Sequence, residues 1–182
     1  MLSTITTEEC RLIAQRLSEK VDLTNDLPAL IFQEKNLDFW FFERSLLGDL
    51  ELFEELLVKS HAQFTRGVGI IFSWASTHYK GRLLDGEAPG SSVLELKHQQ
   101  FGGELALDLP NFYFDTNFEW LAYESSLEEW GVLAMDRSLA NTQFAKFLNQ
   151  EFMSIGDLWR ISKSGDFNGA LARAFLKNYS IN

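Results

Sequence analysis

Apolar residues recur at helical spacing in the N-terminal third of the chain, where two helices are predicted. Thr6 and Glu9 form a T-x-x-E capping box, which satisfies backbone donors at a helix start, so the first helix follows Thr6 directly. Asp49 precedes the run LELFEELLVKSH and is a suitable N-cap for the second helix. The acidic residues of this second run come early, as the helix dipole favours.

Two more helices are predicted in the C-terminal part of the chain. Ser138 or Asn141 can cap a helix that runs through Asn149, with its apolar residues turned inward. The last helix is predicted over roughly Asn168–Tyr179, where apolar residues recur four apart on one face. Helices are therefore expected at both ends of the chain.

Between these helices the pattern changes to runs that are typical of strands. Leu37–Arg44 is aromatic and short, which predicts a buried strand. Gly67–Tyr79 is rich in β-forming residues and apolar on both faces, which predicts a central strand. The glycines, the proline and the polar residues of Lys80–Ser92 predict a loop, and Val93–Gln100 is interpreted as another strand.

A hairpin is the clearest local prediction. Phe118–Glu124 and Trp130–Asp136 are two short β-rich runs joined by the five residues SSLEE. Alternation predicts that Phe118, Trp120 and Ala122 share one face of the first strand.

These elements predict an α+β fold. The predicted strands mostly neighbour one another along the chain, which favours an antiparallel sheet with the terminal helices packed on it. No internal repeat or linker interrupts residues 1–182, so one domain is predicted.

Composition narrows the classes of function. The formal net charge of −10 argues against nucleic acid or an anionic membrane as partner, because phosphate groups require a basic surface. No apolar run approaches the roughly 20 residues that span a bilayer, and the start MLSTITTEEC lacks the features of a signal peptide. A single cysteine, Cys10, forms no internal disulfide and suits a reducing compartment, so a cytoplasmic protein is expected.

No catalytic or metal-binding pattern emerges from the sequence. The three histidines, His61, His78 and His98, lack the spacing of an H-E-x-x-H zinc motif. Cys10 has no nearby base that would make it a nucleophile. We therefore predict no catalytic residues, no metal site and no cofactor.

The charge is unevenly distributed along the chain. Residues 101–136 contain no Lys or Arg, but they contain eight acids: Glu104, Asp108, Asp115, Glu119, Glu124, Glu128, Glu129 and Asp136. A surface of one sign attracts partners of the opposite sign and accelerates their association. This stretch is therefore the candidate contact surface for a basic partner, while the alternative is a solvated acidic surface that keeps the protein soluble.

The run FEWLAYESSLEEWGVLAMDRS, followed by an amphipathic segment with Phe144, Phe147 and Leu148, resembles an ending found in known proteins. Several families of bacterial immunity proteins, from contact-dependent growth inhibition and related polymorphic toxin systems, have a similar aromatic hairpin followed by a helix. The resemblance covers roughly residues 118–150 and implies a cytoplasmic antidote that binds and blocks one cognate toxin domain. No functional position is carried over from these families.

The leading hypothesis is a non-catalytic immunity protein that neutralises a basic toxin domain. Its predicted partner-binding residues lie on and beside the hairpin: Asp115, Glu119, Glu124, Glu128 and Glu129. Strand alternation turns Glu119 away from Phe118 and Trp120, toward solvent.

Two alternatives remain open on the sequence alone. The first is a small-molecule enzyme with a pocket at the end of the 68–79 strand, using His78 with Lys80 or Arg82. The second is a DNA-mimic inhibitor, whose acids would be spaced to imitate phosphates.

Overall fold

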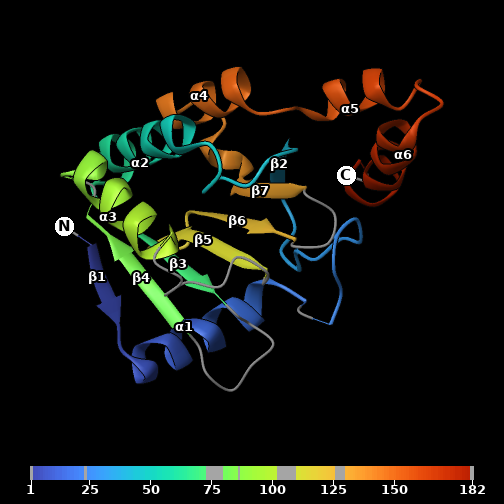
Figure 1. Ribbon diagram of the computed structural model, residues 1–182. Coiled ribbons are helices and arrows are strands. Elements are labelled where there is room, and N and C mark those ends of the chain that lie inside the picture. Colours follow the sequence, from blue (N-terminus) through green and yellow to red (C-terminus); the bar gives the residue numbers. More distant parts are fainter. Residues whose placement is uncertain are drawn as a thin grey trace.

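The computed structural model describes residues 2–22, 24–72, 80–85, 87–101, 110–125 and 130–180. Within these ranges the fold is α+β, as predicted, and is built on one antiparallel sheet (Figure 1). The strands lie in the order β1-β4-β3-β5-β6-β7-β2. They span β1 Leu2–Ile5, β2 Leu37–Phe42, β3 Val68–Phe72, β4 Lys80–Leu84, β5 Asn111–Asp115, β6 Trp120–Glu124 and β7 Gly131–Asp136.

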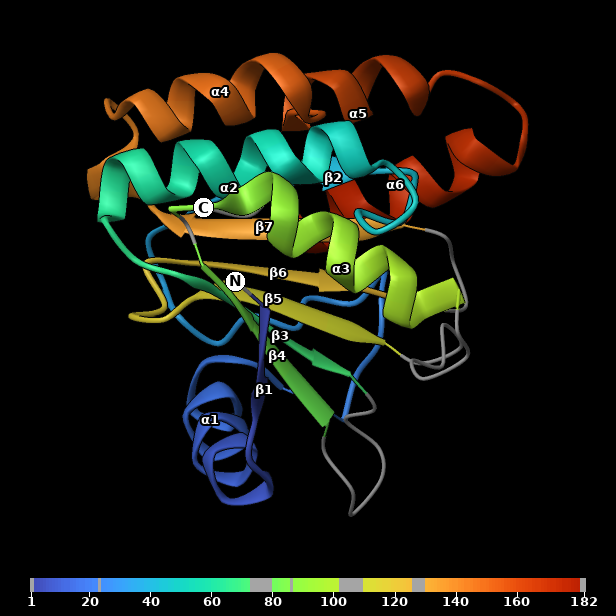
Figure 2. The same cartoon turned by 60° about the vertical axis from the view of Figure 1, so that its left-hand side comes forward.

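The helices lie on both faces of this sheet (Figure 2). One face is covered by α2 Leu50–Phe64, α3 Pro89–Phe101 and α4 Gln143–Glu151. The opposite face is covered by α1 Thr7–Lys20, α5 Ile155–Ile161 and α6 Phe167–Tyr179, together with the segment between α1 and β2. A single 3-10 turn, η1 Arg137–Leu139, joins β7 to α4 in this part of the chain.

Strands β5 and β6 are buried on both faces, which explains their aromatic composition. Tyr113 and Trp120 point into the core beneath α2 and α4, and Phe112 and Tyr123 point into the other core. Because neither face meets water, the polar half of the usual strand alternation is missing here.

The chain passes from one layer of helices to the other around the β2 edge of the sheet. Phe41 and Met153 exchange two backbone hydrogen bonds, with N–O distances of 2.8 and 2.9 Å. This short bridge covers part of the edge strand β2 and leads the chain from α4 to α5 on the opposite face. An edge strand that is covered in this way cannot pair there with another chain.

Most predicted helix starts agree with the structure. Thr6 forms the predicted capping box with Glu9 at α1, and Asp49 caps α2 by accepting the N–H of Leu52. The last helix begins one residue before the predicted start, after Asp166. The prediction of Ser138 or Asn141 as the cap of α4 is wrong, because Thr142 accepts the N–H of Ala145 and performs this function.

Two strand and loop predictions between residues 80 and 100 are also wrong. The predicted loop Lys80–Ser92 contains strand β4 and the start of α3, and the predicted strand Val93–Gln100 is helical. Gly81 suggests a loop, but a Cβ built on Gly81 would lie 2.8 Å from the Cys10 sulfur of α1. This glycine therefore lets a helix approach the strand closely.

The hairpin prediction is confirmed, with one correction. Strands β6 and β7 pair antiparallel from Trp120 with Met135 to Glu124 with Gly131. Phe118 lies outside the strand, with φ of 63°, and packs in the opposite core from Trp120, so the two rings do not share a face. Among the residues that the structure describes, no helix has both the length and the apolar character needed to cross a bilayer.

Gly131 provides a test of the packing between β7 and β2. A Cβ on Gly131 would overlap the ring of Phe42, its direct partner on β2. We expect Gly131→Ala to lower the free energy of unfolding by about 2 kcal/mol, because overpacking of a close contact costs roughly 1–3 kcal/mol. Urea denaturation followed by circular dichroism measures this change.

Gly165→Ala is the matched control. No atom lies within 4 Å of a Cβ at Gly165, which is exposed, so its free energy of unfolding should not decrease. Equal stability of the two variants would contradict the close contact between Gly131 and Phe42.

Candidate functional site

A tight turn between β5 and β6 organises the predicted acidic region. Asp115 is fully buried at the end of β5, and its carboxylate accepts three backbone N–H groups from the turn. The donors are Asn117 at 3.0 Å, Trp120 at 3.3 Å and Glu119. These bonds hold the turn in a fixed shape in which Phe118 adopts left-handed backbone angles.

A polar hollow of about 380 Å³ lies next to this turn. Its charged residues are Lys20 from α1, Glu34 from the segment before β2, Glu119 from the turn and Asp136 from the end of β7. The other residues that line it include Leu37, Phe118, Leu121 and Ala134, which belong to the core beneath α1, α5 and α6. We refer to it as the acidic hollow.

The charges around the acidic hollow are partly compensated. Lys20 Nζ lies 2.6 Å from Glu34 Oε1 and forms an ion pair across the rim. Asp136 accepts the backbone N–H of Ser138, and the hydrogen bonds from Ser138 lower the pKa of the Asp136 carboxyl. Glu119 is exposed and forms no ion pair with any residue in the described ranges. The hollow therefore carries an excess of negative charge, because neither Glu119 nor Asp136 has an ion-pair partner in the described part of the chain.

The predicted partner-binding residues fall into three groups in the structure. Glu119 lies at the rim of the acidic hollow, turned to solvent as predicted. Asp115 and Glu124 are buried, so their carboxylates do not form part of the surface. Glu128 and Glu129 lie outside the described residues.

The buried Glu124 has a structural partner on the neighbouring strand. The hydroxyl of Tyr113 donates to Glu124 Oε2 at 2.6 Å, beneath α2. Burial, and then the adjacent Glu124 carboxylate, raise the pKa of Tyr113 well above its ordinary value. The tyrosine therefore remains a hydrogen-bond donor at physiological pH. Strand alternation places Glu124 on the same face as Trp120 and Ala122, so the sequence already contained a signal for this burial.

Sequence reasoning missed Glu34 and Asp136 as residues of the hollow. Glu34 lies in a segment without periodicity, and its position follows from the pairing of Leu37 with Asp136 between β2 and β7. That pairing joins strands that are distant in the sequence, so only the strand order brings the two acids together. Asp136 belongs to the acid-only stretch and could have been included on that signal.

The residues considered for catalysis show structural roles or lie outside the described ranges. Cys10 is buried, and burial raises the pKa of its thiol, which disfavours a reactive thiolate. Arg82 donates from Nε to Gln99 on α3 at 2.8 Å and so connects a strand to a helix. His78 lies outside the described residues, and so does the pocket proposed for it. No group of three metal-ligating side chains occurs among the described residues.

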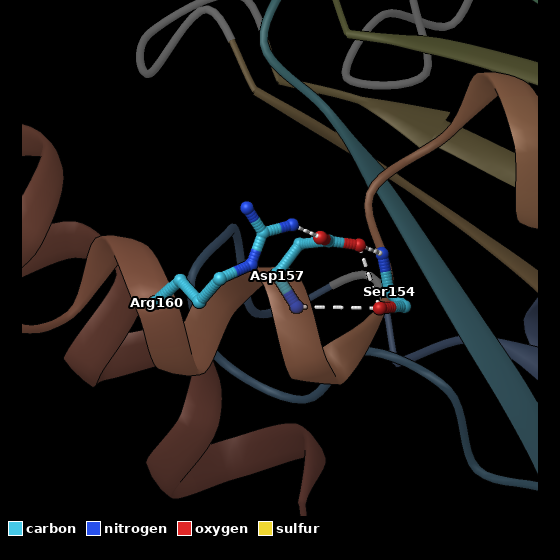
Figure 3. A network of polar contacts seen from close by, with 3 residues as sticks. All are labelled: Ser154, Asp157 and Arg160. Carbon is cyan, nitrogen blue, oxygen red and sulfur yellow. Dashed lines mark hydrogen bonds and ion pairs between the residues drawn. The ribbon is translucent and has the colours of Figure 1, made fainter.

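Ser154, Asp157 and Arg160 form a polar network that could be mistaken for a reactive cluster (Figure 3). Ser154 Oγ donates to Asp157 at 2.6 Å and accepts the backbone N–H of Asp157, while Arg160 donates to the other carboxylate oxygen. Hydrogen bonds from Ser154 lower the pKa of the Asp157 carboxyl. The contacts between Ser154 and Asp157 form the capping box of α5, and Arg160 adds an ion pair with Asp157 within the same helix.

Comparisons of the chain with protein-family models, curated proteins and solved structures find no match. The function is therefore argued from the geometry of the site.

The Asp115 turn can be tested by removing its carboxylate. We expect Asp115→Ala to lower the free energy of unfolding by roughly 3 kcal/mol, because buried donors lose a charged acceptor. Glu119→Ala, in the same turn but exposed, should change it by less than about 0.5 kcal/mol. Urea denaturation of both variants measures the difference, and an equally mild effect of Asp115→Ala would show that the turn does not depend on this carboxylate.

Proposed function

We propose that this protein is a non-catalytic binding protein that neutralises a cognate basic toxin domain, acting as its immunity protein. The observation that carries this proposal is the acidic hollow with its uncompensated rim residue Glu119. The formal net charge of −10 and the resemblance of the segment 118–150 to immunity proteins support the same conclusion.

The shape of the acidic hollow suits a basic side chain of the partner. Lysine and arginine have an apolar stem and a charged end, so they bind well where apolar walls lead to carboxylates. Phe118 and Leu121 provide such walls, and Glu34, Glu119 and Asp136 provide the carboxylates. Its volume of about 380 Å³ is sufficient for one such side chain.

The hollow also rests on fixed elements. The Asp115 carboxylate holds the turn that bears Glu119, and Asp136 is held between β7 and the turn η1. Because these side chains are already ordered in the free protein, little free energy is lost in ordering them when a partner binds. Negative charge on the rest of the protein would accelerate the encounter with a cationic partner.

Charge reversal at the hollow tests this proposal. The probe is the purified product of the neighbouring gene, titrated calorimetrically at low and high salt. Glu119→Lys should weaken binding at least tenfold, about 1.4 kcal/mol, and should make the affinity depend less on salt. Co-expression of the two proteins should restore growth that the toxin domain alone arrests.

Glu95→Lys is the matched control, because it changes the net charge equally. Glu95 is exposed on α3, which packs on the opposite face of the sheet through Val93 and Leu96. Equal losses in both variants would mean that only net charge matters, and an unaffected Glu119→Lys would remove the hollow from the interface. Failure of wild-type protein to bind the domain or to restore growth would overturn the proposed function.

A further inference from the structure

A second, larger hollow of about 630 Å³ lies between α1 and the sheet. This volume is within the roughly 300–1,000 Å³ of small-molecule sites. The apolar side chains of Ile5, Leu12, Ile13, Leu83 and Phe114 line it, and its charged residues are Glu9, Arg16 and Glu19. We refer to it as the apolar hollow.

A glycine on β3 helps to create the floor of the apolar hollow. A Cβ on Gly69 would overlap the ring of Phe114, so this ring lies across the backbone of the neighbouring strand. The ring thus presents an apolar surface to the space beneath α1. Leu12, on the wall formed by α1, is 49% exposed, so apolar surface remains in contact with water. An apolar ligand would remove this surface from water.

A stack of three side chains leads from the floor of the apolar hollow to its rim. The rings of Phe114 and Phe118 are stacked, with centroids 4.9 Å apart and planes inclined by 3°. The guanidinium carbon of Arg16 lies 4.3 Å from the centroid of Phe118, in cation–π contact. A cation–π contact of this kind leaves the N–H groups of the guanidinium available to donate hydrogen bonds to the oxygens of a ligand.

Arg16 is a positioned cation without a carboxylate partner in the described part of the chain. The ion pairs there include Arg11, Arg137 and Arg160, but not Arg16. Glu9 accepts from the backbone and the hydroxyl of Thr6 at 2.9 and 2.6 Å, so its carboxylate is already used in the cap of α1. Glu19 lines the apolar hollow, and the ion pairs of the described residues do not join it to Arg16.

We propose that the apolar hollow binds a small apolar molecule with one carboxylate, of the medium-chain fatty-acid class. The hydrocarbon part would lie between Leu12 and the Phe114 ring, and the carboxylate would accept from the edge N–H groups of Arg16. A guanidinium offers paired donors that match the two oxygens of a carboxylate. This site is separate from the acidic hollow and does not depend on the proposed toxin partner.

The test compares three ligands that share one chain length: decanoate, decanol and decylamine. Isothermal titration calorimetry, below the critical micellar concentrations of decanoate and decylamine and below the solubility limit of decanol, should detect decanoate binding. Decanol should bind at least tenfold more weakly, and decylamine should not bind detectably. Tighter binding of decylamine would assign the site to cations through Glu19 and would overturn the proposal. Absence of decanoate binding would overturn it as well.

Two exposed residues allow the roles of charge and apolar contact to be separated. Arg16→Gln should lower the affinity for decanoate at least tenfold and leave the affinity for decanol unchanged. Leu12→Gln should lower the affinity for both ligands. Arg11→Gln is the matched control, because Arg11 is exposed on the same helix, pairs with Glu8 and does not line the hollow. Equal decanoate affinities of Arg16→Gln and Arg11→Gln would contradict the assigned role of Arg16. Thermal unfolding of each variant confirms that it is folded.

Discussion

The end of the sheet that lies next to both hollows depends on one buried carboxylate, that of Asp115. By accepting three backbone N–H groups, it closes a turn that sends two neighbouring aromatic residues to opposite faces of the sheet. Trp120 enters the core under α2, where its indole N–H donates to Ser60 at 2.8 Å, and Phe118 stacks on Phe114 on the other face. The same turn places Glu119 at the acidic hollow, so a residue in the interior determines where surface charge is presented.

Two hollows of different character lie on either side of this turn. The carboxylates of the acidic hollow come from the segment before β2, the turn before β6 and the end of β7, and the apolar hollow extends under α1. Phe118 belongs to the walls of the first and supports Arg16 at the rim of the second. A shift of the Phe118 ring would therefore change the shape of both hollows, so the turn that holds Phe118 connects them.

The sequence reveals local features well and distant pairings poorly. The capping box at Thr6, the N-cap Asp49 and the β6–β7 hairpin involve residues close in the chain, and all three predictions are confirmed. Strand β4 was not predicted, because Gly81 looks like a loop residue in the sequence, whereas in the structure it allows α1 to pack closely on the strand. The predicted site included Glu124 because its residues were chosen by charge, although strand alternation places Glu124 on the face of Trp120 and Ala122, which is buried beneath α2. The burial of Asp115 follows from the turn that its carboxylate closes, which only the tertiary structure shows.

The order of the strands has a consequence for biosynthesis. Both edges of the sheet, β1 and β2, come from the first 42 residues, while their partners β4 and β7 are translated later. The aromatic strand β2 (LDFWFF) pairs with β7, from Leu37 with Asp136 onward. It therefore has no partner strand until Gly131–Asp136 has left the ribosome. Strand pairings between residues so distant in the sequence slow folding, and they leave hydrophobic, aggregation-prone segments exposed in the nascent chain. Strands β1 and β2 therefore remain without their partners in the nascent chain until β4 and β7 have been synthesised.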